Sequence, residues 1–320
     1  MARDLSVRIG TLALPNPLIA ASGCFGYGLE YEEVADLSAL GGVCVKGLFM
    51  TEREGHPPPR IVETPSGMIN AIGLQGIGVH RFVKEKLPRL RERGARVFVN
   101  VCGSTIDEYV EVSRVLTEAE GVAAIELNIS CPNIKEGGIQ FGCSLLGTAQ
   151  VVSAVRKATH LPVIPKLTPN VTDVASFARA AEDSGADAVS LVNTFLAMVI
   201  DVETRRPTIT NVLGGLSGPA IRPIAVRMVW ECAREVKIPV IGMGGITDAR
   251  DALEFMLAGA TAVQIGTANF VDPFVWTKVL AGLDDYMARH EIEHLSDLIG
   301  AFDPTPVSYT HLTLPTSDLV

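Results

Sequence analysis

Short runs of apolar residues alternate with longer amphipathic stretches along the chain, and this alternation repeats eight times. Most of the short runs are continuously apolar, which is typical of parallel strands buried on both faces. The predicted strands cover residues 18–22, 42–46, 96–101, 123–129, 162–167, 188–193, 239–243 and 262–266. The predicted helices cover residues 31–40, 79–92, 106–119, 148–159, 173–184, 220–236, 248–258 and 273–289. Eight such units in order favour an α/β fold, a single (β/α)8 TIM barrel.

A doubly wound parallel sheet is the alternative fold, because it also alternates strands and helices. Its dinucleotide-binding form requires the motif GxGxxG in the turn after the first strand. Residues 21–28 read ASGCFGYG, which is rich in glycine but does not match that motif. Because the chain also contains eight strand–helix units, we predict the barrel.

One barrel accounts for most of the 320 residues, and we predict a single catalytic domain over residues 1–302. Residues 5–14 alternate around a central Gly10-Thr11 pair, which predicts a short β-hairpin before the first barrel strand. Residues 303–320 match neither strand nor helix periodicity. We therefore expect them to form a tail that is disordered or not native to the chain.

Three connections are too long for simple strand-to-helix turns: residues 47–78, 131–147 and 199–213. Loops longer than about 12–15 residues inside a compact domain usually have functional roles. All three follow predicted barrel strands, and the loops after the strands lie at the face of a barrel where active sites are found. We therefore expect long loops and functional residues over the C-terminal face.

The chain has 27 Lys and Arg against 36 Asp and Glu, a net charge of −9, which argues against a general nucleic-acid-binding protein. It has no apolar run of the roughly 18 residues that span a bilayer, and its first residues do not resemble a secretory signal. We therefore expect a cytoplasmic enzyme with no membrane partner. The six cysteines include no CxxC pair, so we predict neither a disulfide framework nor a metal site.

Glycines follow the seventh and eighth predicted strands. Gly244 and Gly245 close one strand, and Gly266 and Thr267 close the next. In TIM barrels the loops after these two strands commonly bind phosphate through backbone N–H groups. Either glycine group alone is explained by a tight turn, but both together favour a phosphate site, to which Gly218 could contribute.

The fourth predicted strand ends in the sequence NISCPN at residues 128–133, and a Gly-rich segment follows it. A cysteine that only packs is the simpler interpretation of Cys131. However, a thiol beside polar residues at the end of a barrel strand is poorly placed for packing. We predict that Cys131 is a base or nucleophile beneath a loop that closes over it. We predict that the other five cysteines are packing residues.

Lys46 and Lys166 lie in predicted strands that are otherwise apolar. Lysine is rarely buried unless its charge is paired, so both indicate a bound anion or an electron-rich ring. Uncharged polar residues lie near other strand ends and in the second loop: Asn70, Asn100, Asn193 and Thr194. The set contains no carboxylate pair and no histidine cluster, and we predict that the six histidines lie on the surface. It suits a flat cofactor and a small anionic ring, and not metal-dependent hydrolysis.

These motifs together resemble the dihydroorotate dehydrogenase family, over residues from about 4 to about 302. The resemblance is carried by NISCPN at 128–133, Lys46-Gly47, NAIGL at 70–74 and the two glycine groups at 244–245 and 266–267. Residues 58–64, PPRIVET, and residues 135–142, KEGGIQFG, are similar to the catalytic subunit of the type 1B enzymes.

The resemblance implies an enzyme that uses FMN to oxidise (S)-dihydroorotate to orotate in pyrimidine biosynthesis. Cys131 would be the base that removes the C5 proton while a hydride leaves C6. FMN would be held by Ser22, Lys46, Gly47, Asn100, Asn128, Lys166, Val192, Gly218, Gly244, Gly245, Gly266 and Thr267. The substrate would be held by Lys46, Asn70, Ala71, Ile72, Gly73, Leu74, Asn128, Asn193 and Thr194.

The resemblance also implies an electron-transfer subunit that carries FAD and a [2Fe–2S] cluster and passes electrons to NAD⁺, in a heterotetramer of two catalytic and two electron-transfer chains. This chain has no cysteine spacing for such a cluster. Three alternatives are a type 1A enzyme linked to fumarate, a flavin barrel like dihydropyrimidine dehydrogenase, and a non-catalytic barrel that binds a phosphorylated sugar. Colour, the reducing substrate and a requirement for a second subunit distinguish them.

Overall fold

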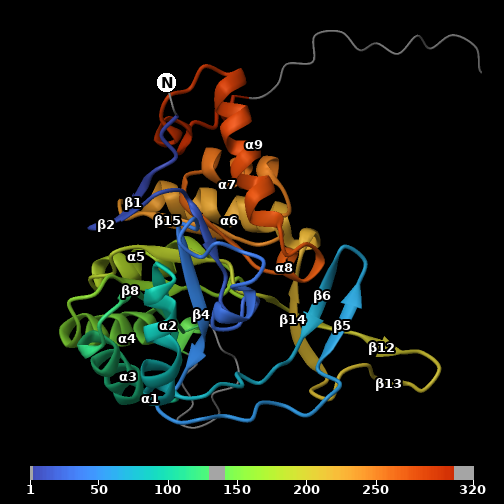
Figure 1. Cartoon of the computed structure of the whole chain (residues 1–320). Helices are drawn as coiled ribbons and strands as arrows, with labels where there is room; N and C mark the ends of the chain where they lie inside the picture. Colours follow the sequence, from blue (N-terminus) through green and yellow to red (C-terminus); the bar gives the residue numbers. More distant parts are fainter. Residues whose placement is uncertain (1–2, 130–140, 306–320) are drawn as a thin grey trace, which may run out of the picture.

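The computed structural model describes residues 3–129 and 141–305. Within them, eight parallel strands close into a barrel in sequence order (Figure 1). These strands are β3 (Leu18–Ala20), β4 (Gly42–Leu48), β7 (Val97–Val101), β8 (Val122–Asn128), β9 (Val163–Lys166), β10 (Val189–Leu191), β15 (Val240–Met243) and β16 (Ala260–Ile265). Each strand end lies within two residues of its predicted position. The TIM-barrel prediction is confirmed.

Helices cover the outside of the barrel (Figure 1). They are α1 (Val79–Arg81) and α2 (Leu87–Glu92), joined by a π-helical segment (Phe82–Lys86), then α3 (Ile106–Glu118), α4 (Leu145–Ala158), α5 (Val174–Asp183), α6 (Arg222–Glu235), α7 (Ala249–Leu257), α8 (Ala268–Val271) and α9 (Val275–Arg289). Four of them begin at a side chain that accepts a hydrogen bond from a backbone N–H of the first turn: Thr105, Ser144, Asp173 and Asp248. These N-caps satisfy backbone donors that the helices leave unpaired.

The helix predicted over residues 31–40 is wrong. The segment contains only the end of a 3₁₀ turn (Leu29–Tyr31), followed by turns without helical continuation. The Asp36 carboxylate accepts hydrogen bonds from the backbone N–H of Ser38 at 3.0 Å and from its hydroxyl at 2.7 Å. Such local bonding offers the backbone an alternative to a helix. Leu37 and Leu40 are nevertheless buried, so the apolar pattern reflects packing of a loop.

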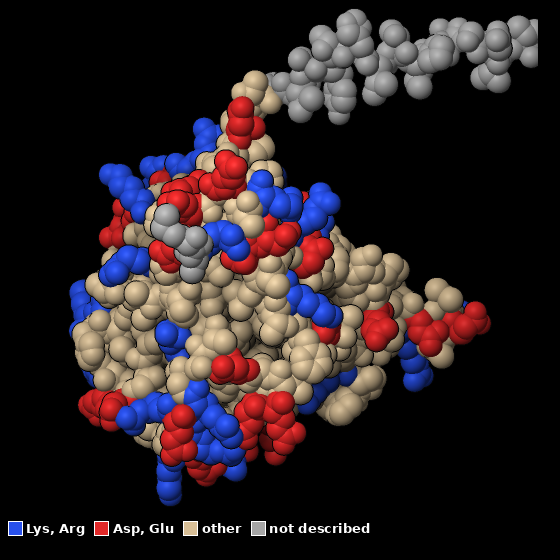
Figure 2. Space-filling model, turned by 45° about the horizontal axis from the view of Figure 1, so that its top comes forward, with Lys and Arg blue, Asp and Glu red and all other residues tan. Residues whose placement is uncertain are grey.

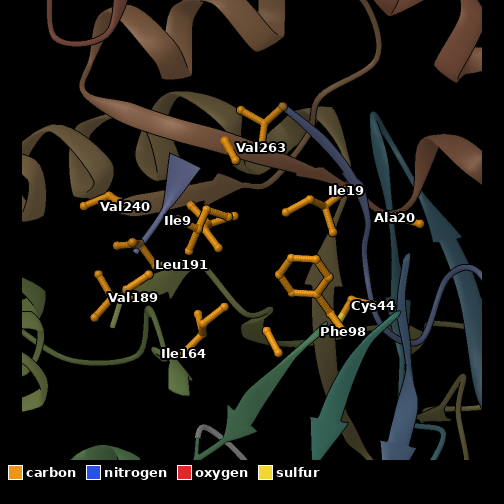
Figure 3. Packing of buried hydrophobic residues seen from close by; sticks show 14 of the residues in the cluster. Ile9, Ile19, Ala20, Cys44, Phe98, Ile164, Val189, Leu191, Val240 and Val263 are labelled. Carbon is orange, nitrogen blue, oxygen red and sulfur yellow. The ribbon is translucent and has the colours of Figure 1, made fainter. Parts of the chain in front are cut away.

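The predicted N-terminal hairpin is present, with β1 (Val7–Ile9) antiparallel to β2 (Leu12–Leu14). Gly10 at its turn has a φ of 57° and lies next to Asp187, which precedes β10. The hairpin therefore contacts the barrel at the N-terminal ends of its strands. Ile9 is completely buried among residues of those strands (Figure 3).

Two of the long loops combine into a second sheet that the sequence analysis does not anticipate. The loop after β4 contains β5 (Ile61–Thr64) and β6 (Gly67–Asn70), and the loop after β10 contributes β11 (Phe195–Met198) and β14 (Leu213–Ser217). These strands form one antiparallel sheet in the order β11-β14-β6-β5. A two-stranded arm, β12 (Ile200–Asp201) and β13 (Arg206–Pro207), extends from it (Figure 1). The sheet stands beside the C-terminal ends of the barrel strands.

Charged side chains of both signs are interspersed on the face shown in Figure 2, mainly around its edges, whereas its middle is formed by uncharged residues. Among the described residues, no helix is both long enough and apolar enough to cross a membrane. Of the predicted tail, residues 303–305 are exposed, and residues 306–320 lie outside the described part of the chain.

Candidate active site

Lys46 lies where β4 loses its regular pairing with β7. The register between the two strands shifts between Val45 and Leu48, and the backbone N–H of Lys46 donates instead to the carbonyl of Gly26 at 2.9 Å. Such an irregularity re-aims a side chain at the end of a strand. Burial, reinforced by the charge of Arg60, lowers the pKa of Lys46, and Glu30 opposes this shift. Lys46 therefore lies within the electrostatic influence of Arg60 and of Glu30.

Gly47 follows Lys46 at a point of close approach. A Cβ atom at this position would lie 2.8 Å from the Cys102 sulfur and 3.0 Å from Asn100 Oδ1. Only glycine lets β4 pass these residues without displacing them.

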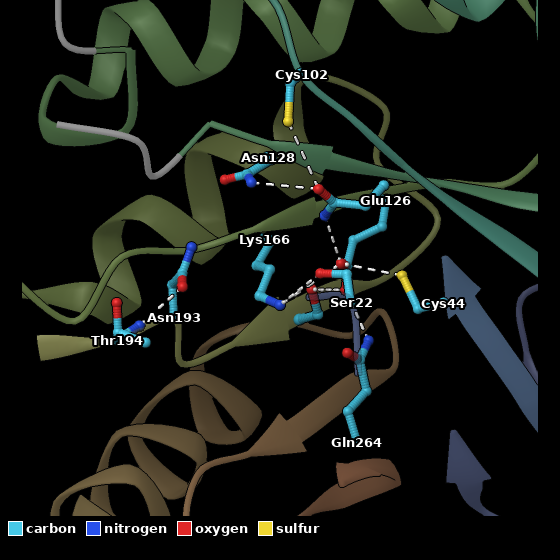
Figure 4. Close-up of polar contacts among 11 residues, drawn as sticks. Ser22, Cys44, Cys102, Glu126, Asn128, Lys166, Asn193, Thr194 and Gln264 are labelled. Carbon is cyan, nitrogen blue, oxygen red and sulfur yellow. Dashed lines mark hydrogen bonds and ion pairs between the residues drawn. The ribbon is translucent and has the colours of Figure 1, made fainter. Parts of the chain in front are cut away.

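Lys166 is the other predicted lysine, and it ends β9 with only 5% of its surface exposed. Its Nζ lies 3.4 Å from the hydroxyl of Ser22, which follows β3, and 3.6 Å from Glu126 Oε2 on β8 (Figure 4). The ammonium therefore joins two sides of the barrel. The sequence indicates a bound anion or an electron-rich ring beside this lysine, and that stays a prediction. The partner that the structure shows is Glu126, a residue that the sequence-based prediction missed.

Glu126 is that missed residue, and it is 1% exposed. Its carboxylate meets side chains from five other barrel strands. Its Oε1 accepts hydrogen bonds from Ser190 Oγ at 2.9 Å and Gln264 Nε2 at 2.6 Å, and its Oε2 accepts from Asn100 Nδ2 at 2.8 Å and Cys44 Sγ at 3.3 Å and pairs with Lys166. The sequence contains a signal that could have identified Glu126, because this charged residue interrupts an apolar strand as Lys166 does.

The Glu126 carboxyl is ionised. Burial alone would raise its pKa, but the Lys166 charge and the hydrogen bonds from Gln264, Asn100 and Ser190 outweigh burial and hold the pKa below its usual range. Charge pairing and donated hydrogen bonds both favour the ionised form of a carboxyl group. The interior of the barrel thus contains a stable ion pair.

Asn100 connects this cluster to Asn128 at the end of β8. Its Nδ2 donates to Glu126, and its Oδ1 accepts from Asn128 Nδ2 at 3.2 Å (Figure 4). The carbonyl of Asn128 accepts a hydrogen bond from the Tyr109 hydroxyl at 2.6 Å. Both predicted amides are therefore oriented by the residues behind them.

Cys44 and two other cysteines depart from the prediction that they only pack. Cys44 is buried but donates to Glu126. Cys143 is exposed and Cys24 is half-buried. The Glu126 carboxylate orients Cys44, and Cys143 lies outside the core. The sequence around a single cysteine does not reveal either feature.

The predicted phosphate-binding glycines converge after β14, β15 and β16. Gly218, Gly244 and Gly245 have φ angles of 101°, 132° and 77°, which residues other than glycine rarely adopt. A Cβ atom at Gly245 would lie 2.7 Å from the carbonyl oxygen of Gly218. The turn after β14 is therefore packed directly against the turn after β15.

The remaining residues predicted to hold FMN lie around these turns. Thr267 Oγ1 donates to Ser217 Oγ at 2.8 Å, next to Gly218 in the chain. Val192, which follows β10, donates its N–H to the carbonyl of Met243 at 3.0 Å and packs beside Gly244. Gly266, which follows β16, has only the Cys24 sulfur and Ala21 near its missing Cβ position.

Apart from Lys46 on β4 and Asn128 on β8, the residues predicted to hold the substrate lie on or beside the second sheet. Asn70 ends β6, and its Nδ2 lies 3.4 Å from the carbonyl oxygen of Gly215 on β14. Thr194 packs so closely on Gly215 that a Cβ atom there would overlap its hydroxyl. Asn193 accepts a hydrogen bond from the N–H of Thr194 at 2.8 Å.

The segment Ala71 to Leu74 continues from β6. His56 is half-buried there, with Nδ1 3.0 Å from the carbonyl oxygen of Ala71, and its ring lies against Gly73. The surface prediction is therefore wrong for this histidine, because the second loop folds back on itself. The backbone of Ile72 contributes to the fold, since its carbonyl accepts from the N–H of His56 at 2.9 Å.

Cys131 lies outside the described residues, so its predicted role as a base stays a prediction. The chain is described up to Ile129 and again from residue 141. The strand that leads to Cys131 is β8, which also carries Glu126 and Asn128.

Comparisons with known proteins identify the family of this chain. The family model described as dihydroorotate dehydrogenase matches residues 4–287. The catalytic subunits named dihydroorotate dehydrogenase B (NAD(+)) of Phocaeicola vulgatus and Bacteroides thetaiotaomicron are each 53% identical over 300 residues, 94% of this chain and 99% of the relative. That of Citrifermentans bemidjiense is 52% identical over the same length.

A solved structure confirms the fold. The crystal structure of DHODH from Eimeria tenella in complex with ferulenol superimposes with a TM-score of 0.78 at 22% identity, covering 93% of this chain and 88% of the other. The family-model match extends over nearly the whole barrel, and the 53% identity covers 94% of the chain. The chain belongs to the dihydroorotate dehydrogenase family.

Proposed function

We propose that this chain is the FMN-binding catalytic subunit of an NAD⁺-linked dihydroorotate dehydrogenase, with its catalytic domain in residues 1–302. It oxidises (S)-dihydroorotate to orotate in pyrimidine biosynthesis. The observation that supports this most strongly is the direct packing of the glycine turns at Gly218 and Gly245 in a barrel whose interior also holds the buried, paired Lys166. The relatives named as NAD(+)-linked catalytic subunits support the electron acceptor.

The described residues fit FMN. The turns at Gly218, Gly244 and Gly245 have no room for side chains, so their backbone would be free to approach a phosphate closely. Lys166 supplies a buried positive charge, which favours negative charge on a reduced flavin. We assign FMN binding to Ser22, Lys46, Gly47, Asn100, Asn128, Lys166, Val192, Gly218, Gly244, Gly245, Gly266 and Thr267.

We assign the substrate to the space bordered by Lys46 and the second sheet. Lys46 and the neighbouring Arg60 suit the carboxylate of dihydroorotate. Amide groups such as those of Asn70, Asn128 and Asn193 can donate to and accept from the ring amides of a pyrimidine. The full proposed set is Lys46, Asn70, Ala71, Ile72, Gly73, Leu74, Asn128, Asn193 and Thr194.

In the proposed reaction, dihydroorotate loses a proton from C5 and a hydride from C6, so that a C5–C6 double bond forms. FMN, when bound, accepts the hydride. We assign removal of the C5 proton to Cys131, which lies three residues after Asn128 in the chain. Lys166 and Asn100 would hold the flavin, and Asn128 would hold both flavin and substrate.

We further propose a partner subunit that carries FAD and a [2Fe–2S] cluster, assembled with this chain as a heterotetramer of two copies of each. The printed name of the relatives, catalytic subunit, supports the existence of a partner. In this scheme the two electrons received by FMN leave through the partner and reduce NAD⁺.

The test uses the full-length chain purified alone and together with the electron-transfer subunit. We expect a yellow protein whose flavin absorbance bleaches when dihydroorotate is added anaerobically. We expect NAD⁺ reduction only when the partner is present. A colourless chain, bleaching by dihydrouracil but not by dihydroorotate, or fumarate reduction by the chain alone would each overturn the proposal.

A further inference from the structure

Glu126 has no role in the proposed reaction, yet it is the most heavily coordinated carboxylate among the described residues of the barrel interior. It is 1% exposed, and its partners come from β4, β7, β9, β10 and β16. Burying a carboxylate costs several kcal/mol, and a buried ion pair is often no more stabilising than well-packed apolar residues. Packing alone therefore gives a weak reason for a carboxylate at this position.

Its location connects Glu126 directly to the proposed flavin site. Lys166 Nζ lies 3.6 Å from Glu126 Oε2, and Asn100 Nδ2 lies 2.8 Å from the same oxygen (Figure 4). Lys166 and Asn100 are both proposed to hold FMN. Both partners are therefore oriented by Glu126.

The charges of the pair act on a reduced flavin in opposite directions. A hydride brings two electrons and one proton to FMN, so the flavin gains one negative charge. The Lys166 ammonium favours this charge and the Glu126 carboxylate opposes it, since Coulomb interactions are weakly screened where water is excluded.

We propose that Glu126 is a positioning residue for Lys166 that also lowers the reduction potential of FMN. Glu126 holds the Lys166 ammonium and offsets part of its charge. The paired lysine therefore stabilises reduced FMN less than an unpaired lysine would. The flavin then remains reducing enough to pass its two electrons through the partner to NAD⁺. This inference rests on the proposed function.

The test compares three variants of the full chain loaded with FMN. Glu126→Gln removes the negative charge. Glu126→Asp keeps the charge on a side chain that is one methylene shorter, so the carboxylate lies farther from Lys166. Glu111→Gln removes the same charge from the exposed side of α3 and is the matched control. The readout is the midpoint potential of FMN, titrated anaerobically against a reference dye, with FMN affinity measured in parallel.

We expect the midpoint potential to rise in the order wild type, Glu126→Asp, Glu126→Gln, and the Glu111→Gln potential to equal that of wild type. For Glu126→Gln the reduced-to-oxidised ratio at a fixed dye potential should rise at least tenfold, or about 30 mV for a two-electron couple. If Glu126 were only structural, both variants would bind FMN more weakly, but their FMN midpoint potentials would not rise in the order Glu126→Asp, Glu126→Gln.

Unchanged potentials, or potentials that fall, overturn the inference. If Glu126→Gln does not fold or bind FMN, then Glu126→Asp decides, because a smaller rise is expected there and an unchanged value contradicts the proposal. If the wild-type chain is yellow and the FMN midpoint potential is the same in wild type, Glu126→Asp and Glu126→Gln, only this inference is overturned. A wild-type chain that binds no FMN overturns the proposed function as well.

Discussion

At the scale of single residues, the interior of this barrel is organised by an ion pair. Glu126 and Lys166 lie on adjacent strands, and their side chains are almost fully buried. The other partners of the pair are uncharged groups: Ser22, Cys44, Asn100, Ser190 and Gln264. A cluster of this kind holds its members rigidly, because each polar atom that moved would lose a partner in a medium of low polarity.

Cys131 carries the proposed chemistry, and replacing it separates cofactor binding from catalysis. We expect Cys131→Ser to retain FMN but to slow flavin bleaching by dihydroorotate about 100-fold or more, because a serine hydroxyl is ionised to a far smaller extent near neutral pH than a thiol with a pKa of about 8.5. Anaerobic stopped-flow absorbance measures the rate. Cys143→Ser, which changes an exposed thiol, is the control and should bleach at the wild-type rate. Bleaching of Cys131→Ser at that rate would refute the assignment.

At the scale of elements, the second sheet is what joins two distant loops at the site. The strand β14 pairs with β11 from its own loop and with β6 from the loop after β4. Asn70 and Thr194 both contact Gly215 on this strand. The substrate residues therefore depend on pairing between segments about 145 residues apart.

Gly215→Val tests this dependence. The new side chain would overlap Thr194 and push apart the residues proposed to hold dihydroorotate. We expect KM for dihydroorotate to rise about tenfold or more, a loss of about 1.4 kcal/mol in binding, with FMN content unchanged.

The control for this prediction is Leu213→Val, which introduces the same side chain at an exposed position of the same strand. It should leave KM unchanged. Equal KM values for the two variants would show that Thr194 and Asn70 do not need the sheet to bind substrate.

The elements also show where local patterns mislead. Residues 31–40 have helical apolar spacing, yet Asp36 bonds to Ser38 and the segment folds as turns. By contrast, the helices that begin at Thr105 and Asp248 match prediction closely, because an N-cap and an apolar face act over the same few residues.

At the scale of the whole molecule, the N-terminal hairpin closes one end of the barrel, and the proposed active site lies at the other end. Ile9 projects from β1 into the main hydrophobic core and is completely buried (Figure 3). The turn of the hairpin contacts Asp187 at the N-terminal end of β10. Stability and catalysis are thus assigned to opposite ends of the strands, as in other barrels.

Ile9→Ala should therefore destabilise the protein without altering its chemistry. We expect a loss of about 2–4 kcal/mol in the free energy of unfolding, the usual cost of such a cavity. Urea denaturation followed by circular dichroism measures this loss. Arg8→Ala, at the exposed neighbouring position, should change the free energy of unfolding by no more than about 0.5 kcal/mol. An Ile9→Ala protein as stable as wild type would contradict closure of the barrel by the hairpin.

The eight barrel strands, the N-terminal hairpin and the positions of Lys46, Lys166 and the glycine turns can all be predicted from the amino-acid sequence. These features are local, because burial on both faces, tight turns and a lysine within an apolar strand each leave a signal within a few residues. The pairing of Glu126 with Lys166 and the single sheet formed by four strands from two loops become visible only in the folded chain. Gln264 reaches Glu126 across 138 residues of chain, and such a contact exists only after the barrel closes.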